Sequence, residues 1–135
     1  MLTHKKAIFF DFDGTLVDSL MDVYTSINHV LKAQNFTPLS LECIKTLVGP
    51  DLRGTLSNAV NQPAFNFDTF IQAYITYYKQ HCTDTTRLFD GATTVLNTLV
   101  NSGKKLFILT NKPEPQTRLI ATKLNIHHYI QKIIG

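Results

Sequence analysis

Two aspartates lie two residues apart directly after a short apolar run, and they are the first candidates for chemistry in this sequence. The run is Ala7 to Phe10, and Asp11, Asp13 and Gly14 follow it closely. Such a run predicts a buried β-strand. Because side chains alternate along a strand, both carboxylates are expected on one face. Two like charges on one face repel each other unless a cation lies between them, so the spacing indicates a site for a hard metal ion.

A second polar pair follows another apolar run. Leu106 to Leu109 predicts a short buried strand, and Thr110 and Asn111 come directly after it. In an open parallel sheet, ligands bind at the carboxyl ends of the strands, where both polar clusters are expected. Thr110 and Asn111 also fit an ordinary helix start before Pro113, and the sequence leaves both interpretations open.

The elements that must position these residues alternate between strands and helices. Strands are predicted at residues 7–10, 106–109 and 129–135, and helices at residues 20–34, 41–48, 52–60, 67–81, 91–102 and 116–124. Strands that alternate with helices imply right-handed crossovers and a parallel sheet. The helical block before residue 91 is too long for one crossover and predicts an inserted lobe. We therefore expect an α/β fold, with a core at residues 1–16 and 84–135 and an all-helical lobe at residues 17–83.

The composition is that of a soluble globular protein. Of 135 residues, 44% are hydrophobic and 17% are charged, and no apolar run is long enough to span a bilayer. The N-terminus lacks the pattern of a signal peptide, so a cytoplasmic location and no membrane partner are expected. The net charge of +3 comes from scattered residues, which argues against a nucleic-acid partner. Cys43 and Cys82 lack metal-ligand spacing and are expected to be buried free thiols.

These motifs together resemble a known family. DFDGTLVDS, a helical insertion and then LFILTNK look like the haloacid dehalogenase superfamily, and within it the phosphoglycolate-phosphatase-like branch with a helical cap. The resemblance runs along essentially the whole chain. It implies a partial, Rossmann-like parallel sheet with an inserted all-helical cap. It also implies a Mg²⁺-dependent phosphatase of small phosphorylated metabolites that works through an aspartyl-phosphate intermediate.

The resemblance implies a role for each residue of the two polar clusters. Asp11 matches the nucleophile that attacks phosphorus, and Asp13 matches the acid that protonates the leaving alcohol and then activates water. The Asp11 carboxylate and the Asp13 backbone carbonyl are implied Mg²⁺ ligands. Thr110, through its hydroxyl, and Asn111, through its N–H, match groups that hold the phosphoryl oxygens, and Gly14 lets the chain turn away above the site. An acid at position 13 argues against carbon–halogen cleavage.

Substrate choice is implied to lie in the cap. The turn Gly49-Pro50-Asp51-Leu52-Arg53 resembles a cap loop that faces the active site in this branch, so Arg53 is a candidate contact for an anionic substrate. A solvent-exposed arginine at a helix start explains Arg53 equally well. Lys112, the last residue of TNK, is a second candidate substrate contact. By its motif position, it is not the lysine that neutralises the phosphorylated aspartate in the family.

The sequence departs from the family after its third predicted strand. That lysine and a further strand ending in Gly-Asp are expected there, but the sequence stops at Gly135. We therefore expect a shortened form of a longer phosphatase, with weak metal binding and little or no turnover. In the family the first strand is central, so here it is expected to form an exposed apolar edge with a capacity for self-association. The alternatives are a phosphomutase of the same superfamily and a non-catalytic module whose exposed edge pairs with another chain.

Overall fold

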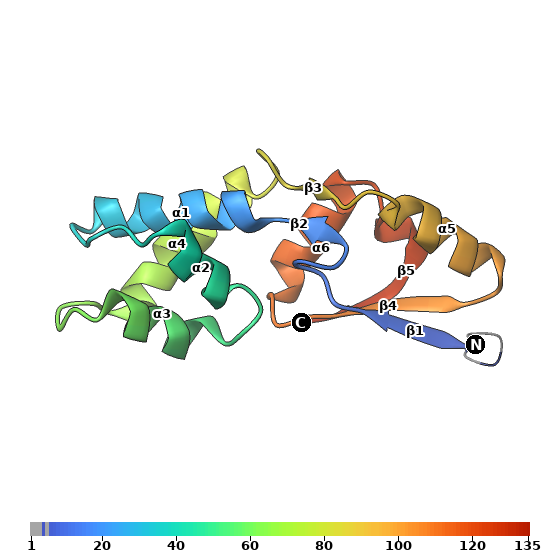
Figure 1. The fold of residues 1–135 in the computed structure, drawn as a ribbon, viewed down its shortest axis with the longest axis horizontal. Helices are drawn as coiled ribbons and strands as arrows, with labels where there is room; N and C mark the ends of the chain where they lie inside the picture. Colours follow the sequence, from blue (N-terminus) through green and yellow to red (C-terminus); the bar gives the residue numbers. More distant parts are fainter. Residues whose placement is uncertain (1–3, 5) are drawn as a thin grey trace. The chain divides into compact units, whose positions relative to one another are not determined.

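The computed structural model describes His4 and residues 6–135, so residues 1–3 and 5 of the expected core lie outside the described part of the chain. The chain forms two compact units. One comprises the chain up to Asp18 together with Arg87–Gly135, and the other is Ser19–Thr86. The first unit carries the main sheet and the second carries four helices (Figure 1).

The first unit contains a parallel three-stranded sheet. Its strands are β1 (Ala7–Phe10), β4 (Lys105–Leu109) and β5 (Ile130–Ile134), in the order β1-β4-β5 (Figure 1). A short 3-10 helix, η1 (His127–Tyr129), precedes β5. The predicted α/β class with a parallel sheet is confirmed. Because all three strands run in one direction, their carboxyl ends lie at the same end of the sheet.

The two faces of this sheet differ in burial. Leu106, Ile108 and Ile133 belong to one face and are at most 4% exposed. Helix α5 (Ala92–Asn101) packs against β4, and helix α6 (Glu114–Lys123) packs against β5. The opposite face carries apolar side chains that remain largely exposed: Phe9 at 55%, Leu109 at 54% and Ile134 at 40%. Alternation along the strands thus produces one packed face and one apolar face that the described residues leave open.

Helix α6 begins two residues before its predicted start at residue 116. Pro115 lies in the first turn of α6, where a backbone N–H has no partner within the helix. The missing N–H of proline therefore costs no hydrogen bond there, so Pro115 is compatible with the helix. The predicted start at residue 116 left Pro115 outside the helix, and that boundary was wrong.

A small antiparallel ribbon closes the first unit where the chain leaves it and returns. Strand β2 (Val17–Asp18) pairs with β3 (Arg87–Leu88), with Val17 opposite Leu88. The predicted core at residues 1–16 and 84–135 contained β3 but not β2. As a result, the helical unit begins at Ser19 and ends at Thr86.

The helical unit contains α1 (Leu20–Ala33), α2 (Leu41–Leu47), α3 (Leu52–Val60) and α4 (Phe67–His81). Three of these helices begin with a side-chain cap, in which Ser40, Asp51 or Asn66 accepts a backbone N–H three residues later. Phe70, Tyr74 and Tyr78 of α4 stack in sequence, with ring centroids 5.8 and 5.3 Å apart, and all are buried. This aromatic stripe is part of the core of the helical unit.

Both cysteines are free thiols, with Cys82 buried and Cys43 only partly so. No helix in residues 4 and 6–135 has both the length and the apolar character needed to cross a membrane.

Candidate active site

The carboxyl ends of β1 and β4 lie side by side. The two strands pair in parallel with Phe10 opposite Ile108, so Asp11 follows one strand next to the point where Leu109 and Thr110 end the other. The Thr110 N–H donates to the Ile134 carbonyl at 2.9 Å, which extends the sheet to β5 at the same end. Parallel pairing therefore brings the two polar clusters together where the sequence predicted them.

A tight turn after β1 sets the directions of the two aspartates. The Phe12 carbonyl accepts the N–H groups of Thr15, Leu16 and Val17, at 3.1, 3.0 and 3.2 Å. The Phe12 ring is fully buried, whereas Asp11 is exposed. One Asp11 carboxylate oxygen, Oδ1, accepts the Phe12 N–H at 2.6 Å, and this contact orients the carboxylate.

Gly14 completes the turn in the left-handed region, with φ at +78°. Its N–H donates to the Val17 carbonyl at 2.9 Å. A Cβ at this position would meet no atom within 4 Å, so the requirement for glycine comes from the backbone conformation and not from crowding.

Asp13 and Lys112 form an ion pair between the two strand ends. The Lys112 Nζ lies 3.2 Å from the Asp13 Oδ1, and these side chains are 10% and 9% exposed. The pair joins the loop after β1 to the loop after β4. It is a direct contact between two predicted site residues that come from different strand ends.

Thr110 and Asn111 occupy the loop that leads into α6. The Thr110 hydroxyl oxygen accepts the Lys112 N–H at 3.1 Å. Asn111, between these two residues, is exposed. This contact is a local turn before a helix, so it fits the simpler interpretation as well as the catalytic one. The loop is also adjacent to the N-terminus of a ten-residue helix, whose unpaired N–H groups favour an anion.

The oxygen donors of this site agree in kind with Mg²⁺, which prefers carboxylates, carbonyls and water. They are few in number: Asp11 and Asp13 supply the carboxylates, and Asp13 is in contact with Lys112. In the part of the chain that the structure describes, no three or more His, Cys, Asp or Glu side chains converge on one point. Asp11, through its carboxylate, and Asp13, through its backbone carbonyl, are the candidate ligands at this end of the sheet.

Arg53 belongs to the helical unit and has local partners there. Its Nη2 lies 2.6 Å from the Asp68 Oδ1, and its guanidinium carbon lies 4.5 Å from the centre of the Phe67 ring. The hydrogen bond with Asp68 raises the pKa of Arg53 and lowers the pKa of Asp68. These contacts join α3 to α4 and account for Arg53 without a ligand.

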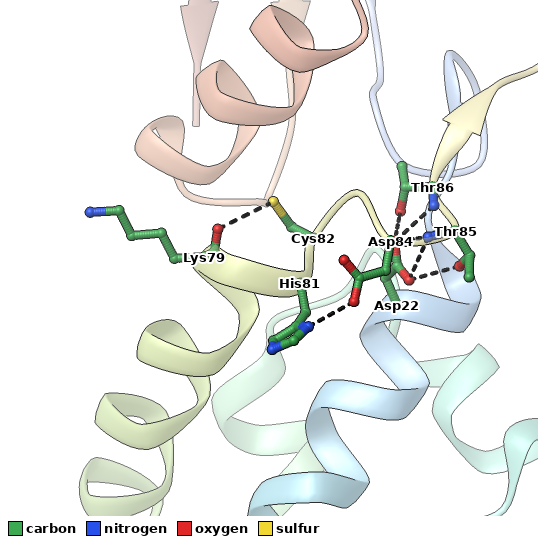
Figure 2. A network of polar contacts seen from close by, with 7 residues as sticks. All are labelled: Asp22, Lys79, His81, Cys82, Asp84, Thr85 and Thr86. Atoms are coloured by element: carbon green, nitrogen blue, oxygen red, sulfur yellow. Dashed lines mark hydrogen bonds and ion pairs between the residues drawn. The ribbon is translucent and has the colours of Figure 1, made fainter.

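Asp22, in the first turn of α1, is a buried acid that the sequence analysis missed. Figure 2 shows its carboxylate directed at Thr85 and Thr86, where the chain leaves the helical unit. Both threonine N–H groups and both hydroxyls donate to it, at distances from 2.7 to 3.0 Å. Asp22 is 3% exposed. Burial alone would raise its pKa, but the hydrogen bonds from Thr86 and Thr85 outweigh this effect and hold the pKa below its ordinary value of 3.8.

The same network includes a surface ion pair. His81 Nδ1 lies 2.7 Å from the Asp84 Oδ2, and the Cys82 thiol contacts the Lys79 carbonyl at 3.8 Å (Figure 2). The only sequence signal for the Asp22 network was the polar segment Thr83 to Thr86. Nothing local could have paired this segment with an acid more than sixty residues earlier.

Known proteins resemble this chain along nearly its whole length. A profile of the family described as haloacid dehalogenase-like hydrolase matches residues 8–135. The phosphoglycolate phosphatase of Agrobacterium fabrum is 30% identical over 92% of this chain and 55% of its own length. The phosphoglycolate phosphatase of Rhodobacter capsulatus is 33% identical over 96% of this chain and 61% of its own length.

A solved structure shows the same fold. The crystal structure of a predicted phosphoglycolate phosphatase from Haemophilus somnus 129PT superposes with a TM-score of 0.88 at 30% identity, over 96% of this chain and 62% of that one. This chain thus spans less than two thirds of the length of these relatives. The profile match covers both motifs, the helical unit and the sheet. The chain belongs to the haloacid dehalogenase-like hydrolase family.

Proposed function

We propose that this chain carries the nucleophile of a Mg²⁺-dependent phosphatase of small phosphorylated metabolites. The relatives in Agrobacterium fabrum and Rhodobacter capsulatus are named phosphoglycolate phosphatases, so phosphoglycolate is the first substrate to test. The observation that supports the proposal most is the parallel pairing of β1 and β4, which joins the two polar clusters through Asp13 and Lys112.

The proposed reaction has two steps. A carboxylate oxygen of Asp11 forms a bond to phosphorus while the bond from phosphorus to the leaving oxygen breaks, and Asp13 gives that oxygen a proton. Water then attacks phosphorus, Asp13 takes its proton, and the Asp11 carboxylate is released together with phosphate. The exposure of Asp11 and its orientation by the Phe12 N–H suit the attacking role.

In this proposal, the other groups at the strand ends bind the phosphoryl group or the metal ion and do not react themselves. Thr110 and Asn111 hold the phosphoryl oxygens beside the start of α6. A Mg²⁺ ion held by the Asp11 carboxylate and the Asp13 backbone carbonyl would reduce the repulsion between the carboxylates and the phosphoryl group. Because the Lys112 ammonium lies beside Asp13, we expect weak metal binding and a turnover below the usual enzyme range, less than about 1 s⁻¹.

The proposed intermediate can be tested without turnover. We expect incubation of the chain with Mg²⁺ and acetyl phosphate, followed by acid quenching and peptide mass spectrometry, to show one added phosphoryl group on the peptide that contains Asp11. Asp13→Asn should still accept the group and lose it more slowly, because water activation is impaired. Phosphate on another peptide, or none above the level of an unfolded sample, would contradict the proposal.

The open side of β1 favours a second candidate function, association of the chain with itself. Among the described residues β1 pairs only with β4, and Phe9 is 55% exposed while its ring stacks on Phe107 at 4.9 Å. An apolar edge strand is a template for pairing with another chain.

We expect light scattering after size-exclusion chromatography to give a mass that increases with concentration. Phe9→Lys should return it to the mass of one chain, because a charge at the edge opposes pairing. Met21→Lys, a charge on an exposed apolar position of the helical unit, is the matched control and should leave association unchanged. A single-chain mass for the unmodified protein at all concentrations would rule this candidate out.

A further inference from the structure

Lys112 places a positive charge between the two candidate catalytic loops. Its ammonium is 3.2 Å from the Asp13 carboxylate, and both side chains are about nine-tenths withdrawn from solvent. Surface ion pairs are screened by water and ions, but a pair this sheltered keeps more of its attraction. Lys112 is therefore a charged group of the site and not a solvated surface lysine.

The backbone of Lys112 is anchored on both sides, whereas its side chain is long. Its N–H donates to the Thr110 hydroxyl oxygen at 3.1 Å, and its carbonyl accepts the Thr117 hydroxyl at 3.4 Å. Thr117 is fully buried in α6 and also donates to the Pro113 carbonyl at 3.1 Å. The anchor thus lies next to the candidate phosphoryl-binding residue, and a four-carbon stem can move the ammonium while the anchor stays in place.

We propose that Lys112 is a charge-compensating residue of this site, with two alternative partners. Without ligands its ammonium neutralises Asp13, and with a divalent cation and a phosphoryl group bound it contacts the phosphoryl oxygens. This inference rests on the proposed phosphatase function. By its motif position alone, Lys112 was not expected to neutralise charge at the site. We assign it this role because of its ion pair with Asp13.

The proposal requires opposite effects on cation and anion binding. An ammonium in contact with Asp13 repels a divalent cation bound at the same strand end, so its removal strengthens cation binding. The same ammonium attracts phosphoryl oxygens, so its removal weakens anion binding. A residue that only supported the fold would not produce two changes of opposite sign.

The experiment is a calorimetric titration of the full chain with Mn²⁺, as a stand-in for Mg²⁺, and separately with inorganic phosphate in the presence of Mn²⁺. For Lys112→Gln we expect the Mn²⁺ dissociation constant to fall by about tenfold and the phosphate dissociation constant to rise by about tenfold, each equivalent to about 1.4 kcal/mol. Lys112→Met, which keeps the apolar stem, should give the same two changes. Lys112→Arg keeps the charge and should leave the Mn²⁺ constant within about twofold of the unmodified chain.

Lys123→Gln is the matched control, because Lys123 is an exposed lysine of α6 and its loss changes the net charge equally. It should change neither constant by more than about twofold. A general loss of binding in both Lys112 variants, an unchanged pair of constants, or no measurable binding by the unmodified chain would each overturn the assignment.

Failure of this inference and failure of the proposed function are distinguishable. If the opposite changes appear but no phosphoryl group forms on the Asp11 peptide, Lys112 has its assigned role in a site that binds phosphate without catalysis. If the phosphoryl group forms but both constants stay unchanged in the Lys112 variants, the function stands and the role of Lys112 is wrong.

Discussion

Asp11→Asn is expected to reduce the hydrolysis of phosphate monoesters by at least about 10³-fold, because an amide cannot act as the attacking oxygen nucleophile. Asparagine keeps the size of the side chain, and its amide oxygen can still accept the Phe12 N–H, so the fold should be retained. Uncatalysed hydrolysis of these esters is among the slowest reactions known. Even a slow enzymatic rate therefore stands far above the background, and a loss of this size is measurable as phosphate release from 2-phosphoglycolate.

The control for this measurement is Asp18→Asn. Asp18 is an exposed aspartate of β2, close in sequence to Asp11 but opposite Arg87 in the ribbon. We expect its rate to stay within about threefold of the unmodified chain, as for a surface substitution outside the site. Equal losses in both variants would show that the rate depends on overall charge or folding. An Asp11→Asn variant with full activity would exclude the proposed nucleophile.

Asp22→Asn is expected to destabilise the helical unit by about 3 kcal/mol, since it leaves partly buried donors of Thr85 and buried donors of Thr86 facing an amide nitrogen. Hydrogen bonds to a charged acceptor are stronger than neutral ones, so the loss exceeds that of a single ordinary contact. Urea unfolding of the full chain, followed by circular dichroism of the helices, measures the change. Thr86→Val, which removes one donor, should cost less than Asp22→Asn.

The same network predicts a pH dependence. The folded chain holds the pKa of Asp22 below its ordinary value of 3.8, so the unfolded chain binds this proton more readily. The stabilisation is therefore complete above the ordinary pKa and is lost as the pH falls through the lower folded value. We expect the unmodified chain to lose more stability than Asp22→Asn when the pH is lowered through and below 3.8.

Asp84→Asn is the control that separates the stabilisation by buried Asp22 from the effect of an ordinary surface carboxylate. Asp84 is paired with His81, but its side chain is 56% exposed. Its loss should cost less than about 1 kcal/mol at neutral pH, as is typical of exposed ion pairs. Similar costs for Asp84→Asn and Asp22→Asn, or parallel pH profiles for the unmodified chain and Asp22→Asn, would refute the role assigned to Asp22.

Local sequence signals predicted the elements well. The apolar run at Ala7–Phe10 became β1 with the predicted bounds, and the run at residues 106–109 lies within β4. Helix α4 also has its predicted bounds, because its aromatic spacing and the Asn66 cap are both local features. The convergence of the two polar clusters followed from a topological rule, which the pairing of Phe10 with Ile108 satisfies.

Other features depend on contacts between distant residues and leave no local pattern. The ribbon of β2 and β3 has two residues in each strand, too few to show alternation. The donors to Asp22 come from residues 63 and 64 positions later. The contact of Lys112 with Asp13 likewise joins two loops that only the folded sheet brings together. Each is a side-chain or backbone contact that chain order alone does not specify.

The Asp22 network also has a consequence for the order of folding. Strand β1 pairs with β4, so folding must bring Ala7 next to Lys105, although the whole helical insertion separates them in the sequence. Closing a long flexible loop costs entropy that increases with the logarithm of its length. Once Asp22 holds Thr86, the 64-residue separation between them no longer contributes to that loop, which becomes about threefold shorter and cheaper to close by about 1 kcal/mol. A helical unit that folds first, through mostly local contacts, would therefore bring the two strands of the parallel sheet closer together before they pair.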